Sequence, residues 1–80
     1  AGFTQRAGET ALSHGEDFVE QLRAQLRANR DYCAQVLRSI PGVHLPEPEG
    51  AFYLFPAIEG LTDSFQFAVR CLEETHVGVA

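Results

Sequence analysis

Apolar residues recur at helical spacing through the first half of the chain. Between positions 19 and 40 the residues of this pattern are spaced alternately three and four positions apart. In a helix this spacing places them on one face: Val19, Leu22, Leu26, Asn29, Cys33, Val36 and Ile40. This pattern predicts one long amphipathic helix near Glu16–Ser39. Acids gather at its start and arginines later, which complements the helix dipole. A coiled coil is the alternative, but only about three heptads fit before Pro41-Gly42 ends the pattern with a predicted turn.

A shorter helix is predicted before the long one. Residues Thr4–Leu12 carry a small apolar face, and Thr4 is a candidate N-cap. The residues Ser13-His14-Gly15 are expected to end this helix.

The second half of the chain predicts short strands and one more helix. Val43–Leu45 is expected to form a brief edge strand, and Ala51–Phe55 a compact apolar strand rich in aromatic residues. Pro56–Leu61 is expected to be a loop. Asp63 is expected to cap a second amphipathic helix, and Val77–Ala80 to begin another strand. The order of elements predicts an α/β fold in which a small sheet is covered by helices.

Composition and charge narrow the class of protein. A chain of 80 residues is expected to bury only about 60% of the surface that its unfolded form exposes, so its stability alone is marginal. The net charge of −5 argues against a nucleic-acid surface. No apolar run approaches the about 20 residues of a membrane span, and no signal peptide is recognised, which predicts a soluble protein; two cysteines read as reduced thiols predict a cytoplasmic one. Cys33 and Cys71 are expected to be buried, reduced thiols.

The side chains that carry chemistry form no catalytic or metal-binding pattern. His14, His44 and His76 lack the partners at helical or Cys-x-x-Cys spacing that a zinc site needs, so no metal site is predicted. The serines have no positioned base, and no glycine-rich phosphate loop is present. Catalytic residues are therefore expected to be absent from this chain.

One segment carries a specific resemblance. Pro48-Glu49-Gly50-Ala51-Phe52-Tyr53-Leu54-Phe55-Pro56 resembles the PxGAFYxFP segment of class I/II pyridoxal-phosphate aminotransferases. Phe3–Ala7, Arg30-Asp31 and Ile40–Gly42 resemble further segments of that family. The resemblance covers essentially all 80 residues and is to the C-terminal small domain of fold-type I enzymes, the aspartate aminotransferase superfamily. It implies a small sheet covered by helices, one of them long and amphipathic.

The resemblance also implies a function. Enzymes of this family transfer an amino group between an amino acid and a 2-oxo acid, and their small domain closes over the active site. A lysine forms a Schiff base with pyridoxal phosphate, an aspartate pairs with the pyridine nitrogen, and an arginine near the C-terminus binds the substrate carboxylate. No lysine exists in this chain. The lysine and aspartate are expected in a large domain before Ala1, and the arginine strand after Ala80.

The implied domain organisation is a single partial domain over residues 1–80. It lacks the large domain, which is expected to bind pyridoxal phosphate, and the final strands. Its implied partners are the remainder of the parent enzyme and the amino-acid and 2-oxo-acid substrates, in a homodimer, with no nucleic acid and no membrane. The chain alone is expected to be inactive.

The resemblance places three residues at the rim of the substrate pocket: Gly50, Ala51 and Phe52. Gly50 is expected to let the backbone turn sharply beside the site, and Ala51 and Phe52 to face the substrate. The other interpretation is that Gly50 is an ordinary turn glycine and that Phe52 alternates into the core. Tyr53 would point to the opposite face from Phe52 in a regular strand.

Two other functions remain open on the sequence. The chain could be a stand-alone α/β interaction module, or an inactive remnant, whose exposed edge and apolar helix faces bind a partner chain. A pyridoxal-phosphate lyase or decarboxylase with the same fold is a further reading, because groups around the cofactor ring select the reaction.

Overall fold

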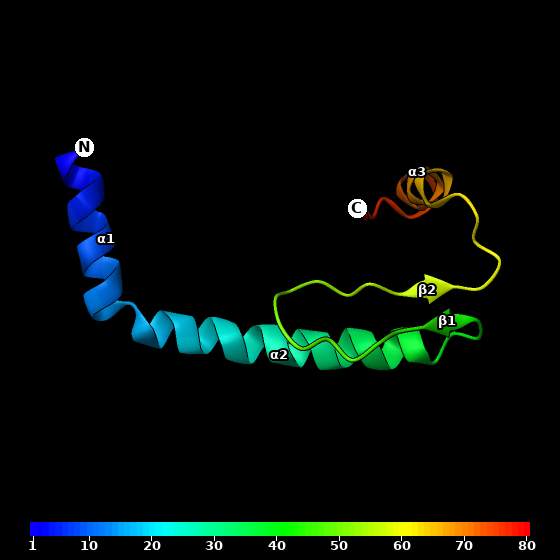
Figure 1. Cartoon of the computed structure of the whole chain (residues 1–80), viewed down its shortest axis with the longest axis horizontal. Helices are drawn as coiled ribbons and strands as arrows, with labels where there is room; N and C mark the ends of the chain where they lie inside the picture. The colour runs from blue at the N-terminus through cyan, green and yellow to red at the C-terminus, as the bar shows by residue number, and fades with distance from the viewer.

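Helices form where the apolar periodicity predicts them. In the computed structural model, which describes residues 1–80, α1 spans Gly2–His14, α2 spans Glu16–Arg38 and α3 spans Ser64–Thr75 (Figure 1). The prediction of one long helix ending near Ser39 is confirmed, with Ser39 as the C-cap. Gly15 separates α1 from α2, and a side chain at this position would collide with the carbonyl oxygen of Ala11.

The first helix begins earlier than the sequence indicated. Its N-cap is Ala1, not Thr4, and no side chain caps it. The Thr4 hydroxyl instead donates to the carbonyl oxygen of Ala1 at 2.7 Å, inside the first turn. Threonine forms such bonds to the preceding turn readily, so the hydroxyl does not mark the boundary.

The third helix is capped as predicted. Asp63 is extended at the N-cap, and its Oδ1 accepts a hydrogen bond from the backbone N–H of Gln66 at 3.0 Å. At the other end His76 adopts a left-handed conformation, and its N–H donates to the carbonyl oxygen of Leu72 at 2.9 Å. Both ends of α3 therefore satisfy backbone groups locally.

The sheet differs from the predicted one. It consists of two antiparallel strands, β1 (Val43–His44) and β2 (Ala57–Ile58), with Val43 opposite Ile58. The edge strand after the Ile40–Val43 turn is confirmed. The expected strand Ala51–Phe55 is wrong, since these residues lie outside the sheet, and part of the expected loop Pro56–Leu61 is β2.

The reason for these differences is strand pairing. Backbone that is rich in aromatic residues becomes a strand only when another backbone pairs with it. β1 pairs with Ala57–Ile58, and the residues before that pair have no neighbour. Val77–Ala80, also predicted as a strand, is unpaired for the same reason. The structure agrees with the predicted α/β class only in that a mostly helical chain carries a small sheet.

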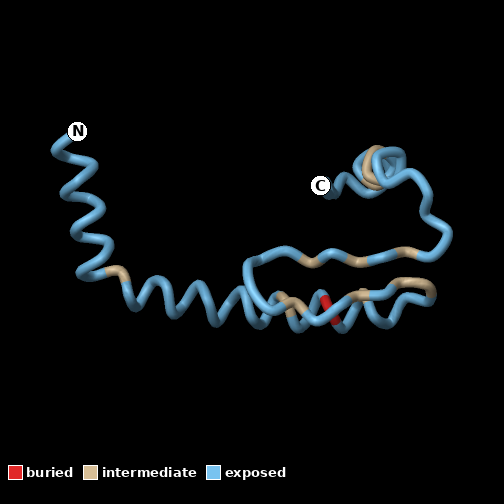
Figure 2. The backbone as a smooth tube through the Cα atoms, in the orientation of Figure 1, coloured by how far each residue is buried: buried red, intermediate tan, exposed pale blue.

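The helices do not enclose a core. α2 contacts α1 and β1, whereas α3 contacts no other helix or strand. Only Ala34 is buried, at 6% exposure, and Figure 2 shows exposed backbone along nearly the whole chain. The radius of gyration is 18.0 Å, against about 12 Å for a compact domain of this length. The apolar stripe of α2 therefore remains partly open to solvent.

One polar contact holds the returning chain on α2. The Arg38 side chain donates through Nη2 to the carbonyl oxygen of Leu45 at 3.1 Å and to Glu47 Oε2 at 3.0 Å. Across the two-stranded sheet, His44 Nε2 lies 3.2 Å from Glu59 Oε1. These contacts fix the path of the chain from Ile40 to Pro48 along the last turns of α2.

Two further expectations can be compared with the structure. Cys33 and Cys71 are free thiols, but the expected burial is wrong: Cys33 is exposed and Cys71 is half-buried. With no second layer over α2 and α3, residues on the apolar faces stay accessible. None of the helices combines the length and the apolar character that crossing a membrane requires.

The small buried core predicts a weakly cooperative chain. On heating in a calorimeter, the 80-residue chain is expected to show no sharp unfolding transition, because hardly any apolar surface leaves water when it folds. Circular dichroism should show gradual loss of helix. A single sharp transition with an enthalpy of about 50–60 kcal/mol, the value typical of this length, would contradict the prediction.

The cap of α3 supplies a second prediction. Replacing Asp63 by Ala should destabilise α3 by about 1 kcal/mol, because the N–H of Gln66 loses its acceptor. Hydrogen exchange at the amides of Gln66 and Phe67 should become faster. The matched control is Asp63→Asn, which keeps a capping oxygen and should preserve most of the protection. Equal exchange in D63A and the unchanged chain would show that the cap contributes nothing.

Candidate functional site

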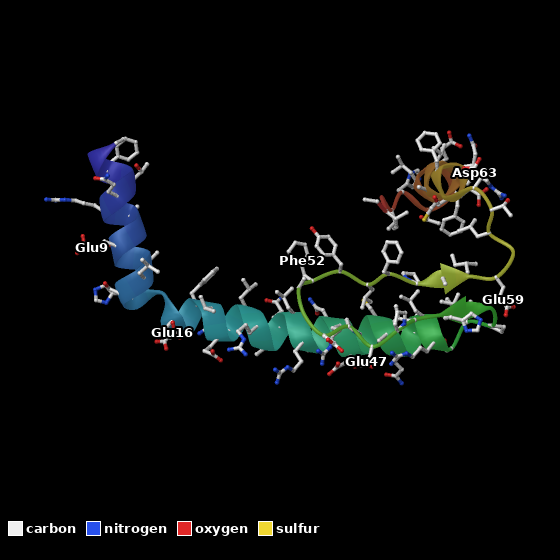
Figure 3. All side chains as sticks on the ribbon, in the orientation of Figure 1. Glu9, Glu16, Glu47, Phe52, Glu59 and Asp63 are labelled. Atoms are coloured by element: carbon white, nitrogen blue, oxygen red, sulfur yellow. The ribbon has the colours of Figure 1, made fainter.

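The predicted rim residues lie where the chain reverses direction beside α2. After β1 the chain runs back along α2, turns at residues 50–52 and returns toward β2 (Figure 3). Phe52, labelled in that view, lies at this reversal. Gly50, Ala51 and Phe52 are all exposed. The structure therefore brings the three predicted residues together on one exposed turn.

A groove separates this turn from α2. It has a volume of about 460 Å³ and lies between the middle of the helix and the segment from Pro48 to Leu54. We call it the α2 groove. Its helical wall is formed by Arg23, Leu26, Arg27, Asn29, Arg30 and Cys33. The volume falls in the range of sites for small molecules.

The backbone strain of the turn lies at Ala51 rather than at Gly50. Ala51 has φ of 58°, in the left-handed region that a residue with a Cβ atom seldom adopts. Gly50 does not adopt a left-handed φ, and a Cβ added to it would meet no atom within 4 Å. Gly50 lies within the bend, as expected, but the left-handed conformation of the turn falls on Ala51.

The two aromatic residues of the turn share one side. The rings of Phe52 and Tyr53 stack with centroids 4.5 Å apart and an interplanar angle of 28°. The expectation that they point to opposite faces is wrong, because it assumed a regular strand and these residues do not form one. The pair presents one continuous aromatic surface, which favours contact with an apolar group.

The arginines of the groove differ in their partners. Arg23 pairs with Glu20 at 2.7 Å, and Arg30 pairs with Asp31 at 2.9 Å. Arg27 makes no ion pair or side-chain hydrogen bond, although the sequence placed Asp31 four residues after it. Asp31 pairs with its immediate neighbour instead. The guanidinium group of Arg27 therefore keeps its hydrogen-bond donors available.

The side chains at this groove are suited to binding a ligand. No cluster of three or more histidine, cysteine, aspartate or glutamate side chains could hold a metal ion. The groove combines arginine donors, an exposed turn and apolar side chains, which can hold and orient a ligand. Sequence reasoning did not assign the arginines to a site. Their spacing in the sequence could have indicated the cluster, since residues 23, 27 and 30 share one face of a helix.

Comparison with known proteins identifies the family. A profile of the family described as "Aminotransferase class I and II" matches residues 1–80. The chain belongs to this family, as the resemblance of the Pro48–Pro56 segment predicted. No solved structure matches this chain.

Individual relatives support the same family. The chain is 37% identical over 86 residues to the aspartate/prephenate aminotransferase of Cereibacter sphaeroides, a match over 94% of this chain and 22% of the relative. It is 36% identical over 81 residues to the asparagine–oxo-acid transaminase of Streptococcus mutans, covering 94% and 21%. It is 37% identical over 82 residues to the aspartate aminotransferase of Pyrococcus horikoshii, covering 99% and 21%. The chain thus spans about a fifth of the length of these curated relatives.

The left-handed residue gives a testable prediction. Ala51→Val should disrupt the turn, because a β-branched side chain tolerates a φ of 58° poorly, at a cost of about 1–2 kcal/mol. The upfield ring-current shifts of Phe52 and Tyr53 in the proton NMR spectrum should then diminish. Gly50→Ala is the control and should leave these shifts in place, since Gly50 has neither a left-handed φ nor a close neighbour. If G50A lost the stacking and A51V kept it, the strained residue would be Gly50 and not Ala51.

Proposed function

We propose that residues 1–80 form the small domain of a fold-type I, pyridoxal-phosphate-dependent aminotransferase and that this domain closes over the substrate. The observation that carries the proposal is the Pro48–Pro56 segment, which follows the family motif and forms the exposed turn beside the α2 groove. Three relatives that are named as aminotransferases or transaminases support the reaction class. The parent enzyme would transfer an amino group between an amino acid and a 2-oxo acid.

In this proposal Gly50, Ala51 and Phe52 form the rim of the substrate pocket. Phe52 is 72% exposed, so its ring is available to cover a ligand held by other parts of the protein. An apolar ring that closes over a substrate removes water and strengthens the electrostatic interactions beneath it. The contribution of the turn is to position the substrate and to exclude solvent.

The residues of this chain do not fit a pyridoxal phosphate site. The cofactor is bound through its aldehyde to a lysine amine, and the chain contains no lysine. We assign the cofactor and the proton-transferring lysine to another part of the parent protein. The chain alone is accordingly proposed to be inactive.

The wider proposal for the parent enzyme follows from its family. Its partners would be amino-acid and 2-oxo-acid substrates, and it would act as a cytoplasmic homodimer. A related lyase or decarboxylase is a variant of the same proposal, because the reaction is selected by groups around the cofactor.

A stand-alone interaction module is the second candidate. It is favoured by the exposed apolar residues on α2 and α3, which a partner chain would cover. The same exposure also suits a domain that packs against the rest of a larger enzyme. A functional replacement experiment separates the two candidates.

In that experiment, residues 1–80 replace the aligned segment of the Pyrococcus horikoshii aspartate aminotransferase. The chimera is expected to bind pyridoxal phosphate and to catalyse transamination. Phe52→Ala in the chimera should raise KM about fivefold, because the exposed ring no longer covers the substrate.

The matched control is Phe65→Ala on α3, since Phe65 has the same 72% exposure and lies outside the groove. This change should alter KM less than about twofold. A chimera that folds and shows the cofactor absorbance but catalyses no transamination would favour the interaction module. Equal effects of F52A and F65A would remove Phe52 from the pocket rim.

A further inference from the structure

The α2 groove gathers arginines in an acidic protein. Its lining holds three of the chain's arginines (Arg23, Arg27 and Arg30) and a single acid, Glu49, whereas the whole chain has a net charge of −5. Half of the six basic residues therefore face one groove. Arginines gathered along one concave surface can present several guanidinium N–H groups to the same ligand.

The donors of the groove are largely free. Arg27 has no partner, so all five of its guanidinium N–H groups are available. Arg30 uses Nε and Nη2 for Asp31, and Arg23 uses Nη1 for Glu20, which leaves further N–H groups on both.

The opposite wall adds backbone donors. The backbone N–H groups of Gly50, Ala51 and Phe52 make no hydrogen bond within the chain. Guanidinium groups and backbone N–H groups are the donors that proteins use for oxyanions, and arginine is suited to them through its planar fork.

We propose that the α2 groove binds a small oxyanion, with Arg27 as its principal ligand and Arg23 and Arg30 in support. The oxyanion is a phosphate group, either free or carried on a small organic body. A volume of about 460 Å³ leaves room for the organic body beside the phosphate. The proposal concerns binding by this chain itself and does not depend on the aminotransferase role.

The test is an NMR titration of the 80-residue chain with inorganic phosphate, in the absence of pyridoxal phosphate. The amides of Gly50, Ala51 and Phe52 should shift and saturate, with a dissociation constant on the order of 1 mM. Arg27→Gln should weaken phosphate binding about fivefold. The affinity of Arg27→Lys should lie between those of R27Q and the unchanged chain, because lysine keeps the charge but lacks the planar, two-pronged guanidinium group. Chloride at matched ionic strength should produce no saturating shift.

The control variant is Arg6→Gln. Arg6 is also exposed and unpaired but lies on α1, so R6Q changes the net charge by the same amount as R27Q and should bind phosphate like the unchanged chain. Circular dichroism should confirm that both variants keep their helix content. Equal weakening in R27Q and R6Q, or shifts that rise linearly with phosphate as they do with chloride, would overturn the proposal.

Titration with phenyl phosphate identifies the source of the oxyanion. Tighter binding than inorganic phosphate supports an organic phosphate, and equal binding supports the free ion. These measurements involve neither cofactor nor transamination. A chimera without activity would therefore not contradict the phosphate site, and a chain that binds no phosphate would not contradict the aminotransferase proposal.

Discussion

The contact between the last turns of α2 and the returning chain organises this structure. Ala34 is the one buried residue, and its small side chain lets the backbone after β1 pass close to the helix. Arg38 then anchors the passing segment through Leu45 and Glu47. Without this contact the turn at residues 50–52 would have no fixed position relative to α2, and the groove between them would not form.

Elements that lack such a contact are held only by local interactions. α3 satisfies its own ends through Asp63 and His76 but packs against no other helix or strand. Its exposed apolar residues, like those on α2, contribute nothing to stability until something covers them. A short chain with one small buried residue gains little from apolar burial against the conformational entropy that folding removes, so its order comes mainly from helix formation and from a few polar contacts.

The difference between local interactions and contacts of distant segments explains what the sequence could and could not predict. The helices and the Asp63 cap depend on residues within a few positions of one another, and they were predicted correctly except for the start and N-cap of α1. Strand pairing depends on which distant backbone is available, so Ala51–Phe55 was assigned to the sheet and β2 was missed. The rim residues Gly50, Ala51 and Phe52 were predicted from a family motif, and their role stays a prediction; the structure places these consecutive residues on one exposed turn. The left-handed Ala51 and the stacked Phe52–Tyr53 rings escaped prediction because both arise from the irregular turn.

The side chains present in this chain define which kinds of chemistry it can contribute to a reaction. The ion pairs Arg23–Glu20 and Arg70–Glu74 are exposed pairs along helices, which stabilise helix surfaces slightly. The chain has no lysine and no cluster of metal ligands. What remains at the turn is shape, apolar surface and hydrogen-bond donors. Such a surface can orient a ligand and exclude water from it.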